Sequence, residues 1–380
     1  MSQEWASVQF KIVVGVIDLG LGDPDFALLP LKLIRRSAEA RLWARFPYFL
    51  QYGTEQGDLP FRHALAAFLH RTWGHEVAAE DLMILHGASG ALDLICTLFT
   101  QPGDTVLTED PTYFLALRIF ADHGLRVIPV PTDAQGLLPD ALETLARKHH
   151  PRLLYTVPTF QNPGGFTLSE ARRQQVVQLA EANGFLVVAD EVYHLLYYDE
   201  PPPPPMAHFT ASEQVISLGS FSKILAPGLR LGWVQAHPTV LKRLTGCGLL
   251  DSGGGLNPFT SALLRNLVAE GDLEAHVSHL RKVYGARRRA MEAALRAELP
   301  EAAFRTPQGG FFFWVRLPEG GDASALQEVA ETFGVRFRPG VLFSPNGGWR
   351  DHLRLCFAFY EEELLKEGVR RLAQAVRHEQ

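Results

Sequence analysis

The stretch that decides the fold reads SLGSFSKILAPGLRLGW and covers residues 217–233. It closes one short apolar run, turns through small and hydroxyl-bearing residues around Lys223, and opens a second apolar run at Leu231. Apolar runs on either side of a turn that contains glycine and proline are typical of two strands of one sheet. Lys223 is therefore either an ordinary surface lysine after a buried strand or a lysine held at a sheet edge for chemistry.

The neighbours of Lys223 favour the second interpretation. Ser220 and Ser222 supply small hydroxyl groups that admit a phosphate, and Arg230 supplies a cation that neutralises it. The glycines of the run let the backbone approach a planar cofactor closely. A lysine that forms a Schiff base with a phosphorylated aldehyde needs these three features, so the run predicts pyridoxal phosphate chemistry at Lys223.

The bulk composition is that of an ordinary globular protein. Hydrophobic residues make up 47% and charged residues 21% of the 380 residues, which is enough for a large core and more than one domain. The formal net charge of −6 gives no electrostatic reason to expect a nucleic acid or an anionic membrane as a partner. A small anionic substrate would need a local basic pocket.

Cysteine usage and the N-terminus indicate the compartment. Cys96, Cys247 and Cys356 are far apart and odd in number, so neither a disulfide framework nor a thiolate metal site is expected. Met1 to Phe10 has no basic region followed by a long apolar run, and no run of 18 apolar residues occurs. We expect a cytoplasmic protein that is neither exported nor membrane-spanning.

The pattern from about residue 60 onward alternates amphipathic stretches with short apolar runs rich in β-branched residues. This alternation predicts an α/β fold with a mostly parallel seven-stranded sheet and helices on both faces. The expected strands are Leu82–Leu85, Thr105–Thr108, Arg126–Val130, Leu153–Val157, Phe185–Ala189, Val215–Leu218 and Leu231–Gln235. The predicted division is a segment over residues 1–50 that packs with the small domain, a large domain over 51–265, and a smaller α+β domain over 266–380.

Residues that directly follow the strands are the first candidates for a site, because a parallel sheet places its ligands beyond the carboxyl ends of its strands. Ala88 and Ser89 lie in a small-residue turn that enters a helix, where free amides and the helix dipole suit a phosphate. Asp190 either caps a following helix or pairs with a protonated pyridine nitrogen. Tyr193 lies three residues further on, and Glu191 is expected to face solvent or a structural partner.

Three more residues have both a structural and a functional interpretation. Asn162 precedes Pro163 and is either a turn residue or, with Tyr193, a donor to the ring hydroxyl oxygen of the cofactor. Tyr113 either packs or stacks on the pyridine ring. Arg354 lies in an otherwise apolar strand, where it either forms an internal ion pair or clamps a substrate α-carboxylate.

These segments together resemble the fold-type I pyridoxal-phosphate aminotransferases of class I/II. The likeness rests on the Ser-x-Ser-Lys run with its Pro-Gly-x-Arg sequel, and on the order of Asn162-Pro163, Asp190 to Tyr193, and Arg354. It spans nearly the whole chain. The chain is most similar to the group that contains 2-aminoadipate and kynurenine aminotransferases and the catalytic domain of MocR-type regulators.

The resemblance implies a role for each candidate around the cofactor, pyridoxal 5′-phosphate. Lys223 would hold the internal aldimine and move the proton between the substrate α-carbon and the cofactor C4′ carbon, while Asp190 would pair with the pyridine nitrogen. Asn162 and Tyr193 would bind the ring hydroxyl oxygen, and Tyr113 would stack on the ring. The residues implied around the phosphate are Ala88, Ser89, Ser220, Ser222 and Arg230.

Substrate and partner expectations follow from the same resemblance. Arg354 would clamp the substrate α-carboxylate, assisted by Asn162 and the backbone at Gly22. Tyr52 matches a tyrosine that such enzymes lend to the phosphate of the neighbouring subunit, so a homodimer is expected. No metal is expected.

The implied activity is amino transfer from an L-amino acid to a 2-oxo acid such as 2-oxoglutarate. A pyridoxal-dependent lyase would use the same cofactor contacts. A MocR-type regulator would need a DNA-binding part before the matching region, which begins near Ile17. The segment Leu21-Gly22-Asp23-Pro24 differs from the Gly-Gly-Leu-Pro usual in the family, and the loop 251–258 differs as well, so the amino donor stays open.

Overall fold

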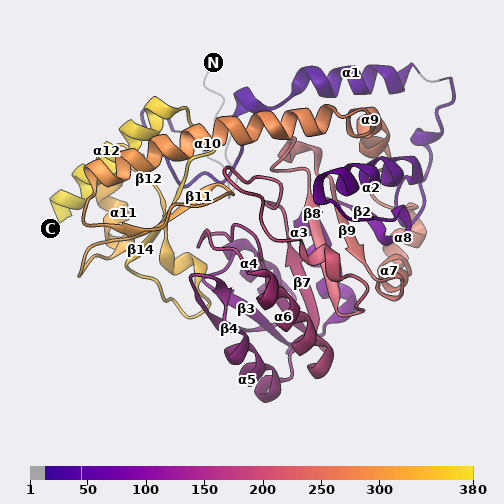
Figure 1. Cartoon of the computed structure of the whole chain (residues 1–380), viewed down its shortest axis with the longest axis horizontal. Helices are drawn as coiled ribbons and strands as arrows, with labels where there is room; N and C mark the ends of the chain where they lie inside the picture. The colour runs from indigo at the N-terminus through magenta and orange to yellow at the C-terminus, as the bar shows by residue number, and fades with distance from the viewer. Residues whose placement is uncertain (1–12, 44, 380) are drawn as a thin grey trace.

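The computed structural model describes residues 13–43 and 45–379. A sheet of eight strands runs through the larger part of the molecule, in the order β2, β9, β8, β7, β6, β3, β4, β5 (Figure 1). The strands are β2 (Leu82–Leu85), β3 (Thr105–Asp110), β4 (Arg126–Asp133), β5 (Gly136–Leu137), β6 (Leu153–Thr156), β7 (Leu186–Asp190), β8 (Val215–Ser220) and β9 (Gly232–Ala236).

The predicted mostly parallel sheet of seven strands is confirmed. Strands β4, β3, β6, β7 and β8 pair in parallel, and β9 lies antiparallel between β8 and β2. The eighth strand, β5, has two residues and pairs antiparallel with the end of β4. It forms at a tight turn too short to show a strand pattern in the sequence.

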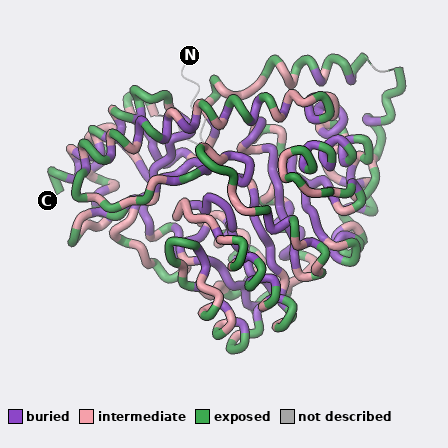
Figure 2. The backbone as a smooth tube through the Cα atoms, in the orientation of Figure 1, coloured by how far each residue is buried: buried purple, intermediate pink, exposed green. Residues whose placement is uncertain are grey.

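Helices cover both faces of this sheet, as predicted. The helices of this part are α2 (Leu59–Trp73), α3 (Gly87–Phe99), α4 (Phe114–Asp122), α5 (Pro139–His149), α6 (Glu170–Asn183), α7 (Pro238–Thr245), α8 (Gly248–Gly253) and α9 (Pro258–Ala269). Successive strand side chains point to opposite faces. Val106 and Leu153 therefore join a core with α3 and α4, whereas Leu107 and Leu154 join a second core with α5 and α6. Figure 2 shows the strands buried and the outer helix faces exposed.

The C-terminal part contains a four-stranded antiparallel sheet in the order β10, β11, β14, β13. Its strands are β10 (Ala303–Phe304), β11 (Phe312–Arg316), β13 (Arg338–Pro339) and β14 (His352–Cys356), and its helices are α10 (Asp272–Glu298), α11 (Ala323–Thr332) and α12 (Glu362–Glu379). Helices α9 and α10 are separated at Gly271, whose φ of +87° interrupts the regular helix.

The N-terminal segment reaches both parts of the molecule. Strand β1 (Ile17–Asp18) pairs in parallel with β12 (Val335–Arg336), and α1 (Leu31–Leu42) lies beside α9. The domain boundaries at residues 50 and 265 stay a prediction. Met1 to Phe10, on which the prediction about a leader rests, lie outside the described residues. Among the helices of residues 13–43 and 45–379, none is long and apolar enough to cross a membrane.

Candidate functional site

A cavity of about 460 Å³ lies beyond the carboxyl ends of the central strands, against the C-terminal part. Its size is that of ordinary small-molecule sites. Every predicted site residue except Tyr52 lines it, and these are Gly22, Ala88, Ser89, Tyr113, Asn162, Asp190, Tyr193, Ser220, Ser222, Lys223, Arg230 and Arg354. Residues from five separate strand ends and from the N-terminal segment thus meet in one place.

Lys223 lies in the turn that follows β8, with its amine inside the cavity. Its Nζ donates a hydrogen bond to the Gly22 carbonyl oxygen at 2.7 Å and lies 3.9 Å from Asp23 Oδ1. Burial lowers the pKa of Lys223, and the Asp23 carboxylate opposes this shift. A lysine that reacts as a nucleophile needs its neutral form, which this burial favours.

Asp190 ends β7 with a carboxylate that is only half satisfied. Its Oδ2 accepts a hydrogen bond from the Tyr155 hydroxyl at 2.8 Å, whereas Oδ1 is buried without a hydrogen-bond partner among the described residues. Burial raises the pKa of Asp190 to about 6, against the hydrogen bond from Tyr155. Residues 192–195 form a turn rather than a helix, so the helix-capping interpretation is wrong. The free oxygen is available to a cationic N–H group.

Tyr155 is a site neighbour that no sequence motif marks. It lies inside β6, on the strand next to β7, and is fully buried. A buried hydroxyl in an apolar strand usually has a polar partner. The pairing of β6 with β7 is needed to show that Asp190 is that partner.

An anion cradle forms where α3 begins. The helix starts without a side-chain cap, so its first N–H groups are free for a ligand. Ser220 Oγ lies 3.0 Å from Ser222 Oγ, and Arg230 donates to the His86 carbonyl oxygen at 3.2 Å. A Cβ atom on Gly87 would stand 2.9 Å from the Arg230 guanidinium, so glycine is required for the arginine to approach the helix start.

Arg354 is held by polar groups rather than by a carboxylate. Its guanidinium donates to Asn162 Oδ1 at 2.9 Å and to the Gly20 carbonyl oxygen at 2.8 Å, and it lies 4.0 Å from the centre of the Phe312 ring. Among the described residues no acidic side chain lies within 4 Å of it, so the internal ion pair is wrong. A buried guanidinium that has no close anionic partner favours the binding of an anionic ligand.

Tyr113 and Tyr193 form two aromatic walls of the cavity. Tyr193 is 3% exposed and meets the Phe311 ring edge-on at 5.4 Å, while Tyr113 stands directly before α4. Burial raises the pKa of both phenols, so both keep their protons and can donate hydrogen bonds. Tyr52 lies outside the cavity of its own chain and is 82% exposed.

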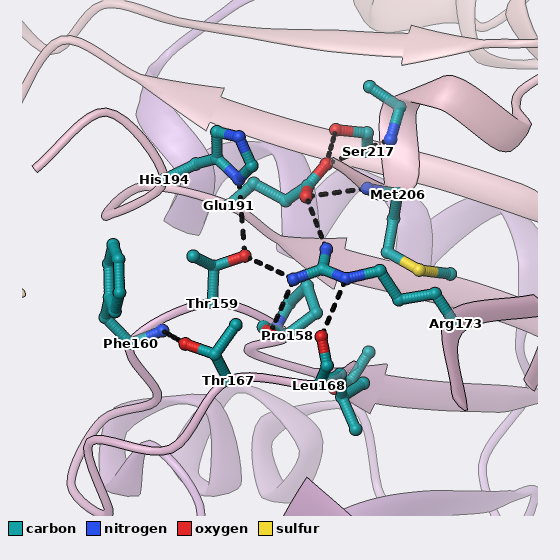
Figure 3. Close-up of polar contacts among 12 residues, drawn as sticks. Pro158, Thr159, Phe160, Thr167, Leu168, Arg173, Glu191, His194, Met206 and Ser217 are labelled. Carbon is teal, nitrogen blue, oxygen red and sulfur yellow. Dashed lines mark hydrogen bonds and ion pairs between the residues drawn. The ribbon is translucent and has the colours of Figure 1, made fainter. Parts of the chain in front are cut away.

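Glu191 has a structural partner and does not face solvent. Figure 3 shows it opposite Arg173 of α6, with Arg173 Nη1 3.7 Å from Glu191 Oε1. Glu191 also accepts hydrogen bonds from Ser217 and from the backbone of Met206. Arg173 donates to the carbonyl oxygens of Pro158 and Leu168 and to the Thr159 hydroxyl. This buried pair fixes the segment that carries Asn162 to the strand end that carries Asp190.

The comparisons with known proteins agree over nearly the whole chain. A family model described as aminotransferase class I and II matches residues 14–372. The chain is 35% identical to an aromatic-amino-acid aminotransferase of Thermococcus litoralis, covering 96% of this chain and 88% of that protein. It is 35% identical to a 2-aminoadipate transaminase of Thermus thermophilus, covering 96% and 90%. A structure of Pyrococcus horikoshii kynurenine aminotransferase in complex with PMP has a TM-score of 0.90 at 35% identity, covering 96% of this chain and 91% of that one.

Proposed function

Because the chain belongs to the class I and II aminotransferases, we propose that it binds pyridoxal 5′-phosphate covalently at Lys223 and moves an amino group from an L-amino acid to a 2-oxo acid such as 2-oxoglutarate. One observation carries the assignment of the site. Asp190 presents a buried carboxylate oxygen without a partner into the cavity that also holds the Lys223 amine. A protonated pyridine nitrogen is the cationic donor that this oxygen lacks.

The remaining cavity residues fit the same cofactor. The uncapped start of α3, Ser220, Ser222 and Arg230 supply donors and positive charge for a phosphate. Asn162 and Tyr193 would donate to the ring hydroxyl oxygen, and Tyr113 would cover one ring face. When bound, pyridoxal phosphate supplies an aldehyde carbon for amines and a ring that accepts electron density from the substrate α-carbon.

The side chains of this chain would bind the substrate and move its proton. Arg354 would hold the α-carboxylate through its guanidinium, with Asn162 and the Gly22 backbone beside it. This contact would direct the α-hydrogen toward Lys223. The Lys223 amine, whose pKa burial lowers, would accept the proton from the substrate α-carbon and carry it to the cofactor carbon C4′.

We extend the proposal to a homodimer in which Tyr52 of each chain reaches the phosphate of the other. Tyr52 does not line the cavity of its own chain and is 82% exposed. Large apolar side chains stand exposed in the same segment, among them Leu42, Trp43, Phe46 and Leu50. An exposed apolar patch of this kind is typical of a surface that another protein covers.

Borohydride reduction tests the covalent role of Lys223. Purified protein with cofactor should absorb at roughly 360 to 430 nm, and reduction should attach the pyridoxyl group to the peptide that contains Lys223. Lys223→Ala should lose this attachment in peptide mass spectrometry, whereas Lys242→Ala, which removes an exposed lysine of α7, should keep it. Attachment at an unchanged level in Lys223→Ala would contradict the assignment. Product analysis with amino acid and 2-oxo acid separates amino transfer from the lyase alternative, which would eliminate a β or γ group.

A further inference from the structure

A second arginine stands beside Arg354 in the cavity. Strand β13 pairs antiparallel with β14, and the register places Arg338 directly opposite Arg354. Residues directly opposite each other in an antiparallel pair present their side chains on the same face, with Cβ atoms about 4.5–5.5 Å apart. Both side chains line the cavity that contains Lys223.

The charge of Arg338 has no direct partner. In the described ranges, 13–43 and 45–379, Arg338 makes no hydrogen bond and has no acidic group within 4 Å. The carboxylate of Asp18 is the nearest opposing charge: burial raises its pKa, and Arg338, without an ion pair closer than 4 Å, opposes this shift together with a hydrogen bond from the Gly20 backbone N–H at 2.8 Å. Asp23 lies against Lys223. Arg336, two residues earlier, is paired with Glu331 and does not line the cavity.

The backbone leaves room for the Arg338 side chain. A Cβ atom on Gly20 would stand 3.1 Å from Arg338 Cγ and 2.9 Å from Asp18 Oδ1, so the glycine lets the arginine stem pass. The same Gly20 accepts from Arg354 through its carbonyl oxygen. One backbone position therefore supports both arginines at the cavity wall.

Two like charges opposite each other on a ladder destabilise the sheet unless anions neutralise them. Asp18 acts on both guanidinium groups without forming a close ion pair with either, and one α-carboxylate neutralises only one of them. We propose that Arg338 binds the side-chain carboxylate of a dicarboxylic substrate, such as glutamate or 2-oxoglutarate, while Arg354 holds the α-carboxylate. The inference rests on the proposed aminotransferase function and identifies Arg338 as a residue that determines substrate specificity.

Binding of unreactive acids to the cofactor-loaded protein tests the proposal by calorimetry. Glutarate carries two carboxylates and pentanoate carries one, at the same chain length. Arg338→Gln should weaken glutarate binding by about 10- to 100-fold, the loss expected of a charge-assisted hydrogen bond, and should change pentanoate binding by less than about 2-fold. Arg338→Lys should retain part of the preference, and the control Arg336→Gln should retain all of it.

Single-turnover spectra provide the second readout. In Arg338→Gln, conversion of the cofactor to its amine form by L-glutamate should slow in the same proportion, whereas conversion by L-phenylalanine should not. Equal losses for both amino acids, or no loss for either, would overturn the inference. If Arg338→Gln does not fold, the wild type still tests the proposal. Equal affinity of the wild type for glutarate and pentanoate would contradict a second carboxylate site. Failure of the wild type to convert with any amino acid would instead overturn the proposed function.

Discussion

At the scale of single residues, Asp190 shows how the site is prepared at the expense of stability. Its carboxylate is buried with one oxygen unpartnered, and burial raises its pKa from 3.8 to about 6. Between these two pH values, the folded protein therefore holds a proton on Asp190 that the unfolded chain has lost. Burial without a cationic partner therefore makes the charged form, which the cofactor would need, less favourable in the folded protein than it is in water.

Asp190→Asn should stabilise the cofactor-free protein at pH 8 but not at pH 4. A carboxyl group whose folded pKa is raised loses stability as pH rises from the unfolded value through the folded value, here from 3.8 to about 6. The difference corresponds to about 3 kcal/mol at most. Urea unfolding at both pH values measures it. A gain of the same size at pH 4 and pH 8 would show that removal of the charge is not the cause.

The same substitution should weaken the cofactor site. Asparagine keeps an oxygen for the Tyr155 hydroxyl but offers no charge to the pyridine nitrogen. Cofactor affinity, measured by dialysis against pyridoxal phosphate, should therefore fall while the free protein becomes more stable. Higher stability together with unchanged affinity would separate Asp190 from the cofactor.

At the scale of elements, the pair of Arg173 and Glu191 joins α6 to two strand ends (Figure 3). Arg173 is fully buried and donates to two backbone carbonyl groups of the segment after β6. That segment carries Asn162, and Asn162 in turn accepts from Arg354. The position of Asn162, for which we propose contacts with cofactor and substrate, therefore depends on an ion pair that does not line the cavity.

Arg173→Leu should lower the free energy of unfolding by about 3–5 kcal/mol, because it leaves the Glu191 charge buried without its cation. Adding Glu191→Gln should recover part of this loss, since the unpaired charge is then removed. Arg147→Leu serves as the control, because Arg147 and its partner Glu143 are both exposed. Its free energy of unfolding should stay close to that of the wild type. Strictly additive losses in the double variant would show that the two side chains are not coupled.

At the scale of the whole molecule, the cavity is assembled from parts that lie far apart in the chain. The large sheet contributes Asp190 and the turn with Lys223, the C-terminal sheet contributes Arg354, and the N-terminal segment contributes Gly22. The proposed dimer adds Tyr52 from a second chain. Each site would then need residues from both chains.

Mixing two defective variants tests this arrangement. Lys223→Ala removes the reactive amine, and Tyr52→Ala removes the contact proposed to cross the interface. In a mixed dimer, the site built around the intact Lys223 also receives an intact Tyr52. Random exchange should make about a quarter of all sites wild type, and aminotransferase activity should rise accordingly. An activity equal to the mean of the separate variants would place Tyr52 outside the neighbouring site.

Local patterns explain why most of the predicted residues line one cavity. The apolar runs and the turns after them identify seven strands, and the chemical groups at strand ends point to Lys223, Asp190 and Arg354. Arg173 and Tyr155 gave no such signal, because an arginine inside a helix and a tyrosine inside a strand are common. Their partners, Glu191 and Asp190, lie on neighbouring strands or loops that only the fold brings close.

The amino-acid sequence by itself determined the α/β class, the strand ends and the chemical groups placed there, since periodicity and turn residues act within a few positions of the chain. Only the tertiary structure decided the strand order, the free oxygen of Asp190 and the register that sets Arg338 opposite Arg354. These features depend on pairing between segments far apart in the chain and on which groups become buried together. Sequence patterns that extend over a few residues indicate neither the long-range pairing nor the joint burial.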